Sequence, residues 1–370
     1  MRIGIYAPNV DENEPSGVER YIIELVHALI RIESGHEFVL ITDAKVWPEQ
    51  SRVKRVPLKT MGKASRLYHD HIKIRDIVKE EEIDLLHTPK STVASGLSCP
   101  SVMTIHDVIF LRYQKAYSSL WKWYWTRTVA RSVERATRIL CVSEQTAKDV
   151  EELLPASRGK VRSIRSGVNL ESFSSFSKER GDQIRKELGV EPPYFFFVGN
   201  ITVRKNIPHL LDAYEKIREE FGGHLILAGG ISYGAEDVLK RVRGENAPKD
   251  IRFLGRISDE QLSALYQGAI SLVYPSQYEG FGLQVLEAMA SGCPVIASRG
   301  GALPEVVGDA GLLIDLASPE ELPEAMLRVY RDESFRADLI RKGHERLGAF
   351  RWEDTARKTM DLYEEAAGSQ

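Results

Sequence analysis

Two glutamates stand eight positions apart around a glycine turn in the segment EGFGLQVLE, residues 279–287. The segment follows ISLVYPS, a run typical of a buried strand, and its apolar spacing predicts a helix that begins near Phe281. The first N–H groups of a helix have no intrahelical acceptor and lie at the positive end of its dipole. Because the glycines let a phosphate approach this backbone, we predict an anion site. Glu287 lies one helical turn beyond Leu283, where a carboxylate accepts hydrogen bonds from paired sugar hydroxyls.

A basic pair, Arg204 and Lys205, follows the strand-like run YFFFVG in the segment GNITVRKN. We expect the pair to open the next helix, where it can supply the countercharge that a diphosphate needs. Two cations oppose the dipole at a helix start, which favours an anionic ligand there. The anion site, the basic pair and the two carboxylates together suit a nucleotide sugar.

The elements that position these residues follow from an alternation of short apolar runs with longer amphipathic segments. This pattern is typical of parallel sheets covered by helices on both faces. The apolar runs predict strands at RIGIYAP, EFVLIT, IDLLHT, SVMTIHD, RILCVS and VRSIRS, and then at YFFFVG, HLILAG, IRFLG, ISLVYPS, PVIAS and GLLID. Helical spacing predicts helices at 18–33, 65–82, 116–137, 143–154, 206–221, 234–243, 258–267, 282–291 and 318–330.

A segment rich in serine and charge, residues 172–182, separates the two series of strands. We therefore predict an α/β protein with two Rossmann-like doubly wound domains, residues 1–175 and 176–351. A C-terminal helix at about 352–370 is expected to pack back on the first domain. Two such domains form a cleft, with ligands at the carboxyl ends of the strands that face it.

Composition excludes several classes of protein. The 370 residues are 43% hydrophobic and 28% charged, as in a globular protein with substantial cores. The chain contains no stretch of about 18 uncharged apolar residues, so no membrane span is predicted. Three widely spaced cysteines predict neither disulfides nor a zinc cluster. The N-terminus enters a strand-like segment at once, which leaves no room for a signal peptide, and we expect a cytoplasmic protein.

Cofactor motifs are missing from the sequence. No Asp-x-Asp occurs and the histidines show no metal-ligand spacing, so we expect a reaction that needs no metal or other cofactor. No GxGxxG follows the first strand-like run, which disfavours a Rossmann dehydrogenase.

Several motifs together resemble glycosyltransferase family 4, which comprises retaining enzymes of the GT-B fold. They are E-x7-E after Tyr-Pro-Ser, the Arg-Lys-Asn segment and the His-Asp pair that ends TIHD. Further similar stretches occur in the order of the family and cover nearly the whole chain: SGVERYIIEL, RILCVSEQTAKDV, SGVNLESF and ALPEVVGDAGLLID.

The resemblance implies a role for each matching residue. Arg204 and Lys205 would bind the donor diphosphate, Glu287 the ribose hydroxyls and Glu279 the transferred sugar. Gly17, in the loop after the first strand, would approach the donor phosphates from the first domain. His106 and Asp107 would line the reaction centre, and His106, Glu279, Arg204 and Lys205 would be catalytic. The donor-binding set is Gly17, Asp107, Arg204, Lys205, Glu279, Gly280, Phe281, Gly282, Leu283 and Glu287.

The resemblance implies a retaining transfer of a hexose from a nucleotide-diphosphate sugar to a hydroxyl of a glycan, a glycolipid or a small acceptor. No enzymic nucleophile is identified, so a front-face route assisted by the leaving phosphate is implied. GDP-mannose is the first choice of donor and a UDP-sugar the alternative. A sugar-nucleotide epimerase and a non-catalytic nucleotide-sugar-binding subunit remain open as other functions.

The acceptor side of the resemblance concerns the first domain. Eight basic residues between Arg52 and Arg75 face a single aspartate, Asp70. Such a run is either a solvated surface or a contact with an anionic acceptor or an anionic membrane. The second interpretation places the protein at the inner face of the membrane. No nucleic-acid partner is expected.

Overall fold

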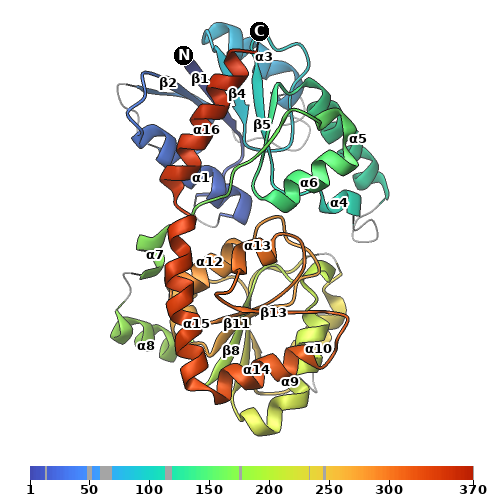
Figure 1. Cartoon of the computed structure of the whole chain (residues 1–370), viewed down its shortest axis with the longest axis vertical. Helices are drawn as coiled ribbons and strands as arrows, with labels where there is room; N and C mark the ends of the chain where they lie inside the picture. Colours follow the sequence, from blue (N-terminus) through green and yellow to red (C-terminus); the bar gives the residue numbers. More distant parts are fainter. Residues whose placement is uncertain are drawn as a thin grey trace. The chain divides into compact units, whose positions relative to one another are not determined.

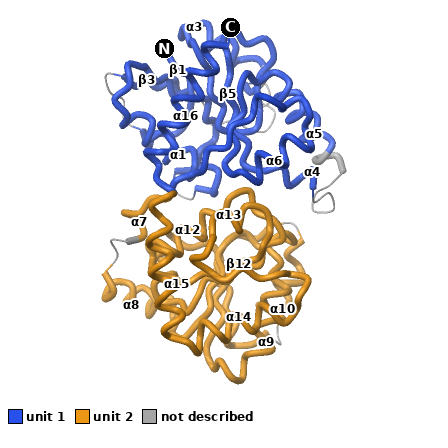
Figure 2. The backbone as a smooth tube through the Cα atoms, in the orientation of Figure 1, with its two compact units in different colours: residues 1–167, 350–370 blue, residues 168–349 orange. Residues whose placement is uncertain are grey.

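The computed structural model describes the chain except residues 13–14, 48–51, 59–68, 113–118, 175–176, 233, 245–246 and 370. It divides into two compact units, residues 1–167 with 350–370 and residues 168–349 (Figure 2). The first unit thus ends at Gly167 and not at residue 175 as predicted. The physical reason is that the Ser-rich break is partly helical and packs on the second unit. Leu170–Ser174 (α7) packs on Asp259–Gly268 (α11) and Leu283–Ala290 (α12), and Lys178–Glu187 (α8) packs on α11.

The first unit is built on a seven-stranded sheet in the order β3-β2-β1-β4-β5-β6-β7, and its neighbouring strands pair in parallel. Each strand predicted from an apolar run is present, with the predicted bounds for EFVLIT and slightly shorter for the others. Strand β3 was not predicted, because this edge strand carries the partly charged run VKRVP. The strands are Arg2–Ala7 (β1), Glu37–Thr42 (β2), Val53–Pro57 (β3), Leu85–Thr88 (β4), Ser101–Ile105 (β5), Arg138–Cys141 (β6) and Val161–Ser163 (β7).

Helices cover this sheet, and the last helix of the chain, Trp352–Ala367 (α16), packs beside the first, Gly17–Arg31 (α1) (Figure 1). The buried Tyr363 hydroxyl is hydrogen-bonded to His87 Nδ1 at 2.6 Å, which fixes α16 to strand β4. The helix predicted at 65–82 is a π-helical turn, His69–Lys73, followed by Ile74–Glu80 (α3), and residues 65–68 lie outside the described part. The other helices are Ile109–Arg112 (α4), Ser119–Arg135 (α5) and Glu144–Leu153 (α6).

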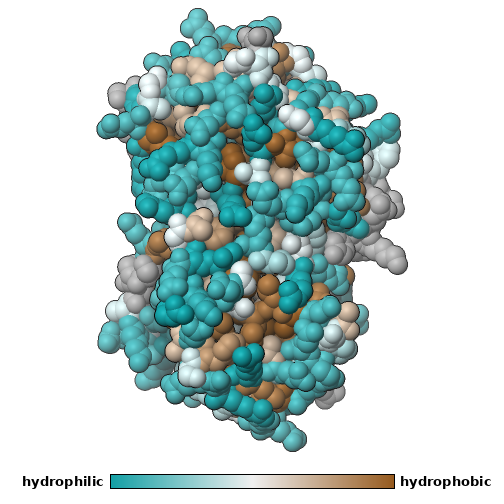
Figure 3. All heavy atoms as spheres, viewed as in Figure 1, coloured by the Kyte–Doolittle hydropathy of each residue, from teal (hydrophilic) through white to brown (hydrophobic). Residues whose placement is uncertain are grey.

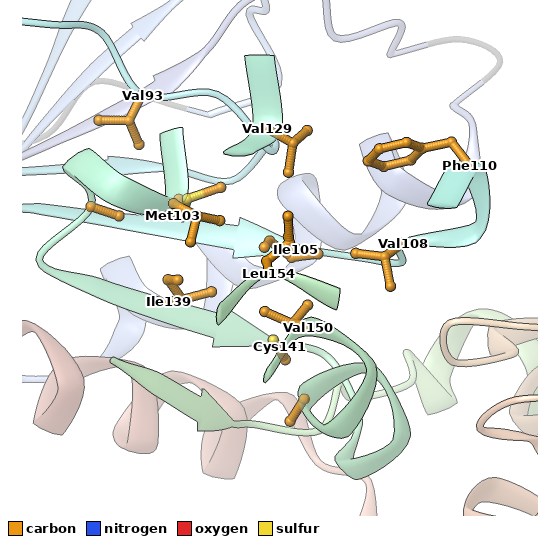
Figure 4. Close-up of a cluster of buried hydrophobic side chains, with 13 residues drawn as sticks. Val93, Met103, Ile105, Val108, Phe110, Val129, Ile139, Cys141, Val150 and Leu154 are labelled. Carbon is orange, nitrogen blue, oxygen red and sulfur yellow. The ribbon is translucent and has the colours of Figure 1, made fainter. Parts of the chain in front are cut away.

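A buried apolar cluster lies beneath the segment that follows strand β5 (Figure 4). Ile105, the last residue of β5, and Val108 are both fully buried in this cluster. The two residues between them, His106 and Asp107, are only partly buried. The apolar anchors on both sides therefore hold the His-Asp pair at the carboxyl end of the strand.

The second unit is built on a six-stranded parallel sheet in the order β10-β9-β8-β11-β12-β13. The chain order reverses between β8 and β11, and ligands of such sheets bind outside the carboxyl ends of the strands at that switch point. The strands are Tyr194–Val198 (β8), His224–Ala228 (β9), Ile251–Phe253 (β10), Ser271–Tyr274 (β11), Val295–Ser298 (β12) and Leu312–Ile314 (β13). The helices after α8 are Ile207–Phe221 (α9), Glu236–Arg243 (α10), Asp259–Gly268 (α11), Leu283–Ala290 (α12), Leu303–Val307 (α13), Glu321–Arg331 (α14) and Glu333–Arg346 (α15).

Among the residues that the structure describes, no helix combines the length and the apolar character needed to cross a bilayer. Hydrophilic residues cover most of the face shown in Figure 3, with apolar residues between them on both units.

Candidate active site

The basic pair lies in the connection between strand β8 and helix α9. Val203–Lys205 form a 3-10 turn, and Asn206 adopts the left-handed conformation with φ of 54°. Helix α9 begins only at Ile207, with a proline in its first turn. The expectation that Arg204 and Lys205 open the helix is therefore corrected: they precede it, because the left-handed residue interrupts the helical backbone. The two side chains project from a turn at the carboxyl end of the central strand.

Glu279, on the loop after strand β11, bridges both cations. Its Oε1 lies 2.7 Å from Lys205 Nζ, and its Oε2 lies 2.7 Å from Arg204 Nη1. Arg204 Nη1 also donates to the Tyr278 carbonyl at 2.7 Å, and the Gln277 N–H donates to the Arg204 carbonyl at 2.8 Å. The two loops of the switch point are thus joined by side-chain and backbone bonds. We name Arg204, Lys205 and Glu279 the charge triad.

The charge triad is largely removed from water. Glu279 and Lys205 are 7% and 5% exposed, whereas Arg204 is partly exposed. Burial by itself raises the pKa of the Glu279 carboxyl, but the Lys205 ammonium and the Arg204 guanidinium outweigh it and lower that pKa to about 2. Glu279 is therefore ionised at neutral pH. Two cations and one anion leave the charge triad with one net positive charge.

The glycine turn leads into helix α12 as predicted, but the helix begins later. Gly282 has φ of 106° and caps the helix, so the first helical residue is Leu283 and not Phe281. A Cβ on Gly282 would also lie 2.9 Å from Leu303 Cδ2, so only glycine fits without strain. Gly280 and Phe281 are buried in the turn that precedes the helix. The Val285 N–H donates to the Gly282 carbonyl at 3.0 Å, whereas the amides of Leu283 and Gln284 come too early for an intrahelical acceptor, as an anion site requires.

The second glutamate of the motif has a different environment from the first. Glu287 lies in the second turn of α12, is 4% exposed, and accepts a hydrogen bond from the Tyr266 hydroxyl at 3.2 Å. The structure therefore brings Glu279 together with the basic pair and places Glu287 with a buried tyrosine of α11.

Sequence reasoning missed two polar residues beside the charge triad. Lys205 Nζ donates to the hydroxyl of Tyr274, the last residue of β11, and lies 4.3 Å from the centre of its ring. The Tyr274 hydroxyl donates to Gln284 Oε1 at 3.0 Å, in the first turn of α12. A tyrosine hydroxyl within an otherwise apolar strand was the available signal, since buried tyrosines normally have a hydrogen-bond partner.

In the first unit, His106 is held through its ring and its backbone. Its Nε2 donates to the Pro89 carbonyl at 3.0 Å, which leaves Nδ1 as an acceptor in the neutral ring. Thr146 Oγ1 donates to the His106 carbonyl at 3.4 Å, and the Tyr21 ring packs edge-on with centroids 4.8 Å apart. Burial is the main reason that the pKa of His106 is lowered to about 4, and the nearby Lys90 ammonium adds to the shift. His106 is therefore neutral at pH 7.

The other two predicted residues of the first unit mark helix starts. Asp107 Oδ1 accepts from the Ile109 N–H at 3.1 Å, where α4 begins. Gly17 is the first residue of α1, behind a capping box made by Ser16 and Glu19. Gly17 is exposed, and the structure describes no atom within 4 Å of the place of a Cβ, apart from its own chain neighbours and helix backbone. Open space of this kind lets a ligand approach the backbone.

The sequence of this chain is similar to those of known glycosyltransferases. The family model for glycosyltransferase family 4 matches residues 15–172, and that for glycosyl transferases group 1 matches residues 180–346. The O-antigen chain mannosyltransferase B of Escherichia coli is 30% identical over 265 residues, which cover 71% of this chain and 70% of that protein. The chain belongs to glycosyltransferase family 4.

Two further similarities extend over more of the family 4 chain. An uncharacterized glycosyltransferase of Methanocaldococcus jannaschii is 26% identical over 365 residues, or 92% of each chain. The structure of sucrose-phosphate synthase from Thermosynechococcus elongatus covers 100% of both chains with a TM-score of 0.80 at 24% identity. The two parallel-sheet units and these neighbours confirm the predicted GT-B fold. The protein is accordingly a glycosyltransferase, and the roles of its individual site residues remain predictions.

Proposed function

We propose that this glycosyltransferase retains anomeric configuration and transfers a hexose from a nucleotide-diphosphate sugar to a hydroxyl of a glycan, a glycolipid or a small acceptor. The observation that carries the proposal is the charge triad, which lies with the first turn of α12 at the switch point of the second sheet. GDP-mannose is the first choice of donor, supported by the similarity to an O-antigen mannosyltransferase. A UDP-sugar is the alternative.

The proposed chemistry begins with the diphosphate. An incoming diphosphate competes with Glu279 for the Arg204 guanidinium and the Lys205 ammonium, both of which Glu279 holds at 2.7 Å. Negative charge grows on the diphosphate as the bond to the anomeric carbon breaks, and the two cations stabilise that charge where it develops. The attacking hydroxyl approaches from the same face and gives its proton to an oxygen of the leaving phosphate.

In this proposal, the carboxylates of Glu279 and Glu287 bind hydroxyl groups of the donor. Glu279 stays ionised because its pKa is lowered to about 2, so on release from the cations it accepts hydrogen bonds from hydroxyls of the transferred sugar. Glu287 accepts from the ribose hydroxyls. In the first unit, the neutral His106 offers Nδ1 as an acceptor for a substrate hydroxyl.

The acceptor side of the proposal concerns the basic segment of the first unit, residues 52–75. Of the basic segment 52–75, Lys59, Lys63 and Arg66 lie outside the described residues. Lys54 forms an ion pair with Glu81 at 2.6 Å and Lys73 one with Glu80 at 3.7 Å, so part of the charge is compensated. We propose that the basic segment serves an anionic, lipid-linked or glycan acceptor at the cytoplasmic face of a membrane.

A screen of nucleotide sugars by thermal shift tests the proposal. A ligand at 100 times its dissociation constant stabilises the protein by about 2.7 kcal/mol. We expect GDP-mannose to raise the melting temperature more than UDP-glucose, UDP-galactose or ADP-glucose, and NMR of the product to show the anomeric configuration of the donor. Stabilisation by UDP-sugars alone would select the alternative donor. Conversion of the donor to another sugar nucleotide without acceptor would indicate an epimerase, and binding without turnover a non-catalytic subunit.

Metal independence is a separate part of the proposal. The two cations of the charge triad supply the countercharge that a metal ion provides in other enzymes, at distances that fit a diphosphate oxygen in place of Glu279. Turnover is expected to persist after exhaustive dialysis and assay in excess EDTA. Loss of turnover that magnesium or manganese restores would contradict this part and leave the donor proposal standing.

A further inference from the structure

Tyr274 connects the two elements that carry the proposed diphosphate site. It is the last residue of strand β11 and is fully buried, and its ring stacks on Phe197 of β8 with centroids 5.9 Å apart. Its hydroxyl accepts from Lys205 Nζ and donates to Gln284 Oε1 at 3.0 Å. One hydroxyl therefore joins the lysine of the β8 loop to a side chain in the first turn of α12.

The direction of the two hydrogen bonds follows from chemistry. An ammonium group can only donate, so the Tyr274 hydroxyl uses a lone pair for Lys205 and keeps its proton to donate, with Gln284 Oε1 at 3.0 Å and the Glu279 carboxylate as its acceptors. That proton fixes which end of the Gln284 amide faces Tyr274: the oxygen faces the tyrosine, and the NH2 group is directed elsewhere. Burial raises the pKa of Tyr274, with the Glu279 charge adding to the effect, so the hydroxyl keeps its proton at working pH.

Lys205 has two contacts of different kinds. Glu279 binds it through charge at 2.7 Å, and this is the contact with which an incoming diphosphate competes. Tyr274 binds it through a neutral hydroxyl and through its ring face, 4.3 Å below the ammonium. An ammonium group has three N–H donors, so Lys205 keeps one for the Tyr274 hydroxyl when a diphosphate takes the place of Glu279.

We propose that Tyr274 is a positioning residue of the transfer reaction: its hydroxyl holds the Lys205 ammonium against the leaving diphosphate and turns the Gln284 amide so that its NH2 group serves the same anion. This inference rests on the proposed donor site. It adds Gln284 as a side-chain donor at the start of α12, next to the backbone amides there.

Two tyrosine-to-phenylalanine variants of the full chain test the inference. Tyr274→Phe removes the hydroxyl and keeps the ring. Tyr194→Phe is the matched control, because Tyr194 is equally buried and its hydroxyl donates to the Leu265 carbonyl at 2.7 Å. Tyr194 is the first residue of strand β8, so it lies at the amino-terminal end of the strands, away from the proposed site. We expect Tyr274→Phe to lower kcat about tenfold with less than about threefold change in the donor KM, because the charge that Lys205 meets develops in the transition state. Tyr194→Phe should leave both constants unchanged.

Gln284→Ala, at a partly exposed position, extends the test to the second partner and remains available if Tyr274→Phe does not fold. We expect it to lower kcat, and we expect its effect to shrink in the Tyr274→Phe background, since coupled residues give non-additive effects. A kcat for Tyr274→Phe within about twofold of the control would overturn the positioning role. Strict additivity would overturn the part that concerns Gln284. If the wild-type protein binds no nucleoside diphosphate in calorimetry, the donor proposal fails instead, which separates the two outcomes.

Discussion

Glu279 Oε2 lies 2.7 Å from Arg204 Nη1, although 75 positions separate the two residues in the chain. One of them is implied to bind the transferred sugar and the other the diphosphate. In the structure they bind each other, and Lys205 completes the charge triad from the other carboxylate oxygen. In the proposed donor complex, a diphosphate therefore replaces the Glu279 carboxylate as the partner of Arg204 and Lys205.

Replacing Arg204 by alanine should lower turnover by about 10- to 100-fold with little effect on the fold. Charge-assisted hydrogen bonds contribute about 1.5–3 kcal/mol each, and Lys205 still neutralises Glu279 in the variant. Steady-state kinetics with saturating donor measure the effect. Arg218→Ala is the control, because Arg218 pairs with Asp250 at 2.6 Å on a more exposed part of the same unit. Equal turnover of the two variants would contradict the role of Arg204 in binding the diphosphate.

Because of Glu279, the free energy of unfolding should depend on pH between about 4.5 and 2. Its pKa is lowered from 4.5 to about 2 in the folded protein, so its stabilising effect is complete above about pH 4.5 and is lost as the pH falls towards 2. At about 1.4 kcal/mol per pKa unit, the lost free energy is on the order of 3 kcal/mol. Melting temperatures of the wild type and Glu279→Gln, compared from pH 7 to pH 3, should therefore converge below pH 4.5. Parallel curves through that window would show that Glu279 has an ordinary pKa.

His106 should titrate far below the usual histidine range. With a folded pKa of about 4, the ring stays neutral from pH 7 down to about 5 and becomes charged only near pH 4. The neutral ring stabilises the fold above the unfolded pKa of about 6.5, and this contribution falls as the pH drops towards 4. NMR titration of the His106 Cε1–H resonance, assigned with His106→Gln, measures the midpoint. A midpoint near 6.5 would mean that the ring is solvated.

Two glycine-to-alanine variants should separate strain from ligand contact. Gly282→Ala forces a side chain into a positive φ of 106° and against Leu303, so we expect a loss of about 1–3 kcal/mol of stability. Gly17→Ala adds a methyl group to open space at a helix start and should leave the melting temperature unchanged. If Gly17 approaches the donor phosphates, the same variant should nevertheless raise the donor KM. A Gly17→Ala enzyme with wild-type kinetics would remove Gly17 from the donor site.

Most of the fold could be predicted because buried parallel strands are near-continuous apolar runs, and β8 with its sequence YFFFV is the clearest of them. Two of the missed elements, β3 and α8, carry little apolar signal. Strand β3 lies at an edge and contains Lys54 and Arg55, and helix α8 is strongly polar. Only the N-cap at Ser177, whose side chain accepts from the Arg180 N–H, marked α8 in the sequence.

The sequence motifs named candidate site residues, but they did not show which of those residues contact one another. The sequence motifs named Arg204, Lys205 and Glu279, but no local pattern shows that they form one cluster. That contact depends on the placement of β8 beside β11, although β9 and β10 come between them in the chain. The hydrogen bonds of Tyr274 depend on the same placement, so they become visible only when the sheet order is known.

Helix α16 has a consequence for how the protein forms during synthesis. Residues 350–370 belong to the first unit, whereas the whole second unit is one uninterrupted stretch of chain. On the ribosome, the second unit therefore has all of its residues available before the first, although the first begins to emerge earlier. Until α16 arrives, His87 lacks its Tyr363 partner and the face of α1 that α16 covers is open to solvent. The two units are therefore completed in the reverse of the order in which their sheets begin to emerge.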